Sequence, residues 1–138
     1  MKIAVSACLL GQNCKYNGGN NYNKKVMDFI YGHECIPVCP EVMGGLSTPR
    51  NPSEIVNGVV TQNNGNIVDR EFREGARIAL ELVLKEKVDM VILQSRSPSC
   101  GVKNIYDGTF SKTLINGQGI FASLLKEHGI KMVDVEDL

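Results

Sequence analysis

Residues 70–93, REFREGARIALELVLKEKVDMVIL, decide the fold class, because a helical pattern runs directly into a buried-strand pattern. Residues 70–86 carry apolar side chains at helical spacing, and Asp69 is expected to cap the start of this helix. The apolar positions of the helix are Phe72, Ala76, Ala79, Leu80, Val83 and Leu84. Residues 88–93 form an apolar run interrupted only by Asp89, which is typical of a parallel strand covered on both faces.

The same alternation of strands and helices extends along the rest of the chain. Strands are predicted at residues 2–6, 35–39 and 130–135, and helices at residues 22–31 and 118–128. The residues expected to face inward from these two helices are Val26, Phe29, Ile30, Ile120, Phe121, Leu124 and Leu125. Alternating strands and helices predict an α/β fold, a small Rossmann-like three-layer sandwich with a mostly parallel sheet.

One segment interrupts this alternation. Residues 44–54 contain paired glycines and two prolines and are expected to form a loop. The turn signal Asn63-Asn64-Gly65 then separates two β-prone runs, residues 56–61 and 66–68. Because Asn-Gly favours the tight turns of hairpins, we predict an inserted β-hairpin at this point.

Length and charge narrow the class of protein. The chain has 138 residues, a length typical of one domain, and we expect a single domain over residues 1–138. Fifteen basic and fifteen acidic residues balance, so no charge bias indicates a nucleic-acid partner. No apolar run approaches the ~20 residues needed to cross a bilayer, and the first residues are typical of a strand, not of a signal peptide. We therefore expect a cytoplasmic protein with no membrane partner.

Three of the five cysteines follow predicted strands. Cys8 comes after residues 2–6, Cys39 closes residues 35–39, and Cys100 follows residues 88–93. The carboxyl ends of parallel strands line one edge of a sheet, where ligands bind. Disulfides are rare in a reducing compartment. Three converging thiols therefore indicate a metal or iron–sulfur centre with one position left open.

The other cysteines and the histidines are weaker candidates. Cys35 and Cys39 would lie about 13 Å apart in an extended strand at ~3.3 Å per residue, so they cannot share one small centre. Cys39 ends the strand and is the better ligand, and Cys35 is interpreted as a buried apolar residue. Cys14 is either a fourth ligand or a structural thiol that supports its loop. His33 and His128 lie at helix ends and are interpreted as surface or capping residues.

Three segments together resemble the thiouracil desulfurase family, and the resemblance covers nearly the whole chain. The segments are Ser6-Ala7-Cys8-Leu9-Leu10-Gly11 with Cys14, Cys39-Pro40-Glu41 with Gly44-Gly45-Leu46 and Pro49-Arg50, and Ser97-Pro98-Ser99-Cys100-Gly101. The resemblance implies that Cys8, Cys39 and Cys100 ligate three irons of a 4Fe–4S cluster. The fourth iron would be open to the sulfur of the substrate, and Glu41 and Ser97 would lie beside the cluster.

By the same resemblance, the activity is the non-redox desulfuration of a small thiolated base such as 2-thiouracil. The chemistry is reasonable for these residues, because an open iron is a Lewis acid that polarises a C–S bond. Glu41 can act as general base for the attacking water, and Ser97 can hydrogen-bond the base or the departing sulfur. The residues considered as further pocket or supporting positions are Arg50, Glu54, Ser99 and Lys103.

Other functions fit the same residues. The cysteines could hold zinc or iron in a non-catalytic protein, Glu41 could serve only the dipole of a helix, and Ser97 could be a plain turn serine. Cys8 could be a nucleophile, but no arginine closes its loop as in the phosphatase pattern. No dinucleotide or P-loop fingerprint is present, which argues against a nucleotide cofactor.

Overall fold

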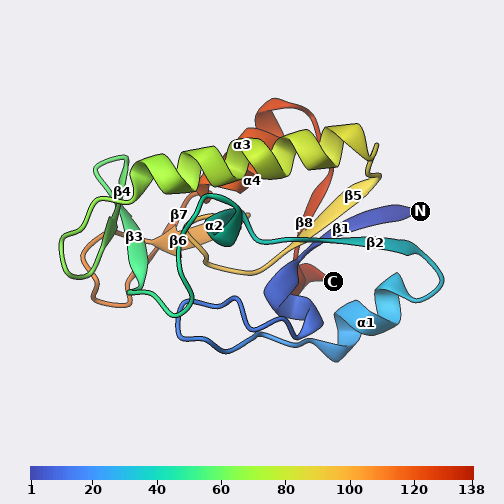
Figure 1. The fold of residues 1–138 in the computed structure, drawn as a ribbon, viewed down its shortest axis with the longest axis horizontal. Helices are drawn as coiled ribbons and strands as arrows, with labels where there is room; N and C mark the ends of the chain where they lie inside the picture. Colours follow the sequence, from blue (N-terminus) through green and yellow to red (C-terminus); the bar gives the residue numbers. More distant parts are fainter.

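Four parallel strands form the centre of the fold, in the order β2-β1-β5-β8 (Figure 1). The strands are β1 (Lys2–Ser6), β2 (Glu34–Val38), β5 (Met90–Leu93) and β8 (Met132–Asp134), in a computed structural model that describes residues 1–138. Strands β1 and β5 are inner strands, and β5 is buried along its whole length. This order confirms the predicted Rossmann-like parallel sheet.

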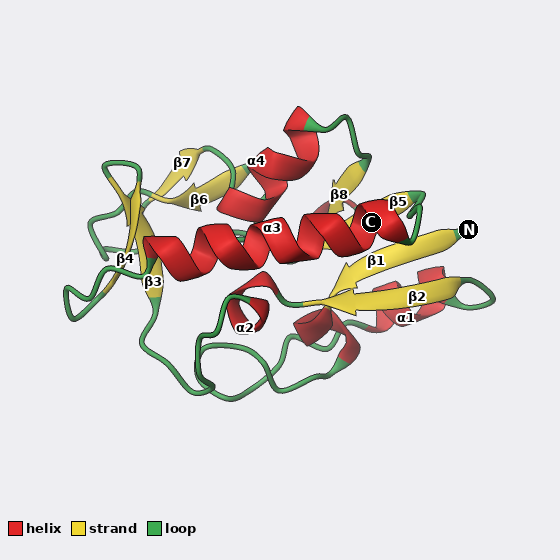
Figure 2. Cartoon of the chain, turned by 45° about the horizontal axis from the view of Figure 1, so that its top comes forward, coloured by secondary structure: helices red, strands yellow, loops and turns green.

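Helices cover both faces of the sheet. Helix α1 (Lys24–Ile30) lies on one face, where its residue Val26 packs with Ile3 and Val5 of β1. Helices α3 (Asp69–Lys85) and α4 (Ile120–Glu127) lie side by side on the other face, as Figures 1 and 2 show. Each face therefore has its own apolar core, which accounts for the three layers of the sandwich.

The helices differ from their predicted extents and faces at a few residues. Phe29 is 39% exposed and Leu84 is 50% exposed, although both were expected to face inward. The reason is that each helix has a neighbour along only one stripe, and side chains beside that stripe or at a helix end stay in solvent. Asp69 does not cap its own helix. Its carboxylate instead accepts a hydrogen bond from the backbone amide of Val60 at 3.0 Å.

The inserted hairpin exists, but its predicted position was wrong. Strands β3 (Ser53–Val56) and β4 (Val59–Gln62) pair around Asn57-Gly58, whose φ angles are +50° and +80°. Such angles suit the two-residue turn that Asn-Gly favours. The Asn64-Gly65 turn leads only to an isolated bridge between Thr61 and Ile67. Both sites carry the same turn chemistry, so only the pairing of the flanking residues distinguishes them.

A second small hairpin was not predicted. It consists of β6 (Asn104–Tyr106) and β7 (Leu114–Asn116), which pair antiparallel. Every residue of β7 is exposed, so the segment carries no alternation of buried and exposed side chains that a sequence pattern could reveal. No helix of the structure is long and apolar enough to cross a bilayer.

Two short helices follow β1 and β2 and position the loops at the sheet edge. They are the 3₁₀ helix η1 (Ala7–Leu10) and α2 (Pro40–Met43). Helix α2 packs against α3 through glycines: a Cβ on Gly75 would overlap the carbonyl oxygen of Pro40, and one on Gly44 that of Glu71. The absence of side chains at these positions lets the two backbones touch, which fixes α2 over the end of β2.

Candidate active site

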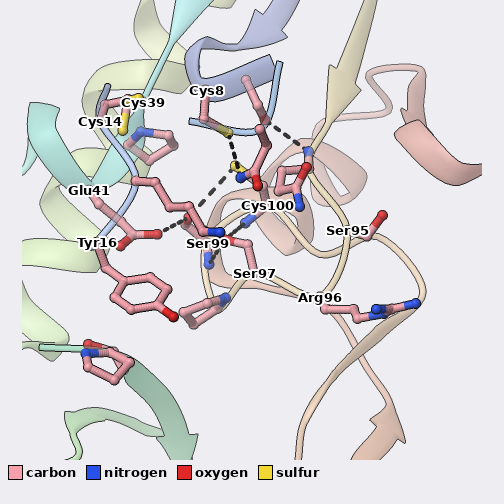
Figure 3. Close-up of a pocket in the computed structure, with 18 of the residues that line it drawn as sticks. Cys8, Cys14, Tyr16, Cys39, Glu41, Ser95, Arg96, Ser97, Ser99 and Cys100 are labelled. Atoms are coloured by element: carbon pink, nitrogen blue, oxygen red, sulfur yellow. Dashed lines mark hydrogen bonds between the residues drawn. The ribbon is translucent and has the colours of Figure 1, made fainter. Parts of the chain in front are cut away.

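A cavity of about 720 Å³ opens at the carboxyl edge of the parallel sheet. Cys8 reaches it from η1, Cys39 from the junction of β2 and α2, and Cys100 from the loop after β5 (Figure 3). Three thiols that lie far apart in the chain therefore line one cavity, at the edge where ligands bind in open parallel sheets. Glu41 and Ser97 line the same cavity.

Burial keeps two of these thiols protonated in the absence of a positive partner. Burial raises the pKa of Cys8 above its ordinary value. The side-chain amide of Asn21 donates a hydrogen bond to the Cys8 sulfur at 3.5 Å and has a smaller, opposing effect. Burial also raises the pKa of Cys100 to about 12, and the nearby hydroxyls of Ser6 and Ser99 have a smaller, opposing effect. A bound metal centre would reverse this balance, because metal ligation favours the thiolate.

Cys39 behaves differently because Cys14 lies beside it (Figure 3). A hydrogen bond from the Cys14 thiol lowers the pKa of Cys39 to about 7, and the same interaction raises the pKa of Cys14. Cys14 itself is held in place through its carbonyl, which accepts a hydrogen bond from Arg50 Nη2 at 2.9 Å. The structure thus places Cys14 in the cavity as the immediate neighbour of Cys39.

The remaining cysteine and both histidines lie outside the cavity. Cys35 is half-buried on β2 and packs against the core on the α1 face of the sheet. His33 hydrogen-bonds the amino terminus at 2.9 Å, and His128 Nδ1 lies 2.9 Å from the carbonyl oxygen of Leu124. The two histidines thus lie at surface and capping positions, as interpreted from the sequence, whereas Cys35 packs against the core but is only half-buried instead of buried.

Glu41 is held at both carboxylate oxygens. Its Oε1 accepts hydrogen bonds from Arg50 Nε at 3.2 Å and Arg50 Nη2 at 3.1 Å. Its Oε2 accepts one from the Ser99 hydroxyl at 2.8 Å. The side chains of Arg50 and Glu41 are only 5% and 16% exposed. This carboxylate lies in the first turn of α2, but its partners come from two other segments, so its role exceeds that of a helix-end charge.

Ser97 lies in a tightly folded loop that carries Cys100. The Ser97 hydroxyl oxygen accepts hydrogen bonds from the backbone amides of Ser99 at 3.1 Å and Cys100 at 3.0 Å. The loop rests on the start of α4, where the amide of Ile120 donates to the carbonyl of Pro98 at 2.8 Å. Ser97 is therefore a turn serine in its backbone contacts and a cavity-lining residue in its position.

Of the further pocket candidates, Arg50 and Glu54 line the cavity and Lys103 does not. Lys103 instead forms an exposed ion pair with Asp137 at 3.1 Å. The carboxylate of Glu54 accepts hydrogen bonds from the backbone amides of Gly108 at 3.0 Å and Phe110 at 3.1 Å, so it holds the loop after β6. The sequence alone does not reveal whether a basic residue lines the cavity, as Arg50 does, or forms an exposed ion pair, as Lys103 does.

Other lining residues were missed from the sequence. Asn21 donates to the Cys8 sulfur, and Tyr16 and Arg96 line the wall of the cavity (Figure 3). Arg96 adopts a left-handed backbone conformation with φ of +63°, which is uncommon for a residue with a side chain. The only sequence signal for these residues was the turn-forming segment Lys15-Tyr16-Asn17-Gly18, which indicated a loop around Tyr16.

Arg50 is expected to be a major stabilising residue of this site. Replacing it by methionine would leave the Glu41 carboxylate and the Cys14 carbonyl without their buried partner. We expect the Arg50→Met variant to lose about 3 kcal/mol of unfolding free energy, as for other broken buried ion pairs. Urea unfolding of both proteins would measure the loss.

The matched control for this prediction is Arg77→Met. Arg77 pairs with Glu74 and Glu81 on the surface of α3, where solvent screens the charges. We expect the unfolding free energy of this variant to be close to that of the parent protein. Equal losses in the two variants would contradict the importance of the Arg50–Glu41 pair.

Nowhere in the structure do three His, Cys, Asp or Glu side chains gather closely enough to hold a single metal ion. A four-iron cluster makes a different demand, because each cysteine binds a separate iron of the cluster. Three cavity-lining thiols on separate loops therefore suit a multinuclear centre better than one zinc ion, whose ligands must converge on one point.

Known proteins are similar to this chain in sequence, and one solved structure is similar to it in fold. Residues 3–137 match the family described as 2-thiouracil desulfurase. The uncharacterised protein YbbK of Bacillus subtilis (strain 168) is 36% identical over 146 residues, which cover 99% of this chain and 97% of that protein. The solved structure of the 4Fe-4S-dependent thiouracil desulfidase TudS matches with a TM-score of 0.94 and 39% identity, over 99% of this chain and 92% of that one. The chain therefore belongs to the 2-thiouracil desulfurase family.

Proposed function

We propose that this chain is an enzyme that removes sulfur from a small thiolated base such as 2-thiouracil, at a 4Fe–4S cluster held by Cys8, Cys39 and Cys100. The observation that carries the proposal is the convergence of these three thiols in one cavity with the Glu41 carboxylate. The dependence of the structurally similar TudS on a 4Fe–4S cluster supports it. The proposed active unit is the single domain of residues 1–138.

The residues present fit such a cluster. Thiolates are the usual protein ligands of iron–sulfur clusters, and the buried thiols of Cys8 and Cys100 need a positive partner to ionise. Three thiol ligands leave one iron without a protein ligand. When bound, the cluster supplies a Lewis-acidic iron that can accept the substrate sulfur and polarise its bond to carbon.

The protein's own groups complete the reaction. Glu41 accepts a proton as water attacks the carbon that carries the sulfur, and Ser97 holds the loop that carries Cys100 in place by hydrogen bonding. Oxygen from water replaces sulfur on the base, and hydrogen sulfide leaves. One C–S double bond becomes one C–O double bond, so no electron acceptor or donor is required.

The experiment that tests this function uses the protein reconstituted anaerobically with iron and sulfide. We expect about four iron and four acid-labile sulfide atoms per chain, as in a 4Fe–4S cluster. Incubation with 2-thiouracil, without reductant, should then release uracil and sulfide in equal amounts over many turnovers. Binding of zinc alone, or a loaded protein that releases no sulfide from thiolated bases, would overturn the proposal.

A further inference from the structure

We propose that Ser99 is a positioning residue that joins Ser97 and Glu41 into one hydrogen-bonded chain with a fixed direction, from Ser97 to Glu41. This inference rests on the proposed function, because it concerns how the two catalytic candidates act. Ser99 lies between them, with its hydroxyl oxygen 2.9 Å from Ser97 Oγ and 2.8 Å from Glu41 Oε2. We call Ser97, Ser99 and Glu41 the hydroxyl chain.

The direction at the Glu41 end follows from the chemistry of a carboxylate. An ionised carboxylate can only accept hydrogen bonds, so the Ser99 hydroxyl must be the donor. Ser99 Oγ also lies 3.7 Å from the Cys100 sulfur, but sulfur is a weak acceptor and the contact is longer. The single proton of Ser99 is therefore directed to Glu41, and its oxygen is left to accept.

The direction at the Ser97 end follows from counting lone pairs. A hydroxyl oxygen has two, and those of Ser97 are occupied by the backbone amides of Ser99 and Cys100. Ser97 can therefore take part in its 2.9 Å contact with Ser99 only as donor. Both ends of the hydroxyl chain give the same direction.

The surroundings keep the chain in this state. Ser99 is only 2% exposed, so water cannot readily compete for its hydroxyl. Arg50 occupies the other carboxylate oxygen, Oε1, which leaves Oε2 to the serine side. Because the Ser97 proton and both Ser97 lone pairs are engaged within the loop, Glu41 itself takes the proton of the attacking water, at the lone pair of Oε2 that Ser99 leaves free. Ser99 keeps its own proton and holds the Glu41 carboxylate in place during this step.

A double-mutant cycle tests whether Ser99 acts through Glu41. We expect Ser99→Ala to lower kcat about 100-fold, within the range for general-base steps, and to leave KM and the iron content nearly unchanged. In a Glu41→Gln background the same substitution should change kcat by less than about threefold, since coupled residues are not additive. An equal loss in both backgrounds would overturn the proposal, because it would show that Ser99 acts independently of Glu41.

A second cycle, on unfolding midpoints, needs no activity. Ser99→Ala should lower the unfolding midpoint less in the Glu41→Gln background than in the parent protein. The reason is that Glu41→Gln already weakens the buried hydrogen bond between Ser99 and residue 41. Ser99→Thr keeps the hydroxyl and should restore most of the lost kcat, and Ser123→Ala on α4 serves as the matched control. A parent protein that fails to desulfurate thiouracil defeats the proposed function. An active parent with additive cycles defeats only the hydroxyl chain.

Discussion

The Cys100→Ala variant is expected to hold less than about one iron per chain after anaerobic reconstitution, against about four in the parent protein. Cys100 is the most buried of the three proposed ligands, and its loop is fixed by Ser97 and by the start of α4. No other cysteine lines the cavity from the β5 side, so nothing can replace the lost thiolate. Desulfuration activity should disappear with the iron.

Two further cysteine variants separate ligation from packing. Cys35→Ala removes a thiol from β2 outside the cavity, and we expect it to keep its full iron content. Cys14→Ala removes the neighbour of Cys39 and tests whether Cys14 is a fourth ligand. Because Cys14 lies beside Cys39 instead of on a separate side of the cavity, we expect this variant to retain the cluster. Iron in Cys100→Ala equal to that of Cys35→Ala would contradict the proposed ligand set.

The Glu41→Gln variant is expected to retain its cluster and lose about 10³-fold in kcat, within the range for loss of a general base. Glutamine has the size of glutamate. Its carbonyl oxygen can still accept from Arg50 while its amide NH2 donates to the Ser99 hydroxyl oxygen, so the local structure should persist. What it cannot do is take up a proton from water. Single-turnover release of sulfide from 2-thiouracil would measure the loss.

Glu54→Gln is the comparison variant for this prediction. Glu54 lines the same cavity, but its carboxylate accepts hydrogen bonds from backbone amides, a function that glutamine can share. We expect the fold loss of kcat in Glu54→Gln to be less than a tenth of the fold loss in Glu41→Gln. Similar losses in the two variants, or a loss of iron in Glu41→Gln, would show that Glu41 supports the cavity and not the proton transfer.

Local patterns predicted the elements that have strong periodicity. The long amphipathic helix α3 and the apolar strand β5 lie within two residues of their predicted bounds, because side-chain spacing is a property of the local sequence. The hairpin shows the limit of such patterns. Asn57-Gly58 and Asn64-Gly65 are equally good turns, and only the pairing of Ser53–Val56 with Val59–Gln62 selects the first as the hairpin.

By itself, the sequence determined the parallel α/β sandwich and the placement of Cys8, Cys39 and Cys100 after strands, because parallel strands end at one edge whatever the details of packing. Only the tertiary structure decided how Glu41 is held. Its partners, Arg50 and Ser99, come from two other segments. These segments meet Glu41 because α2 packs against α3 and because the loop that carries Ser99 is hydrogen-bonded to the start of α4. Periodicity records which face of an element is buried, but hydrogen bonds between loops depend on distances that no single segment contains.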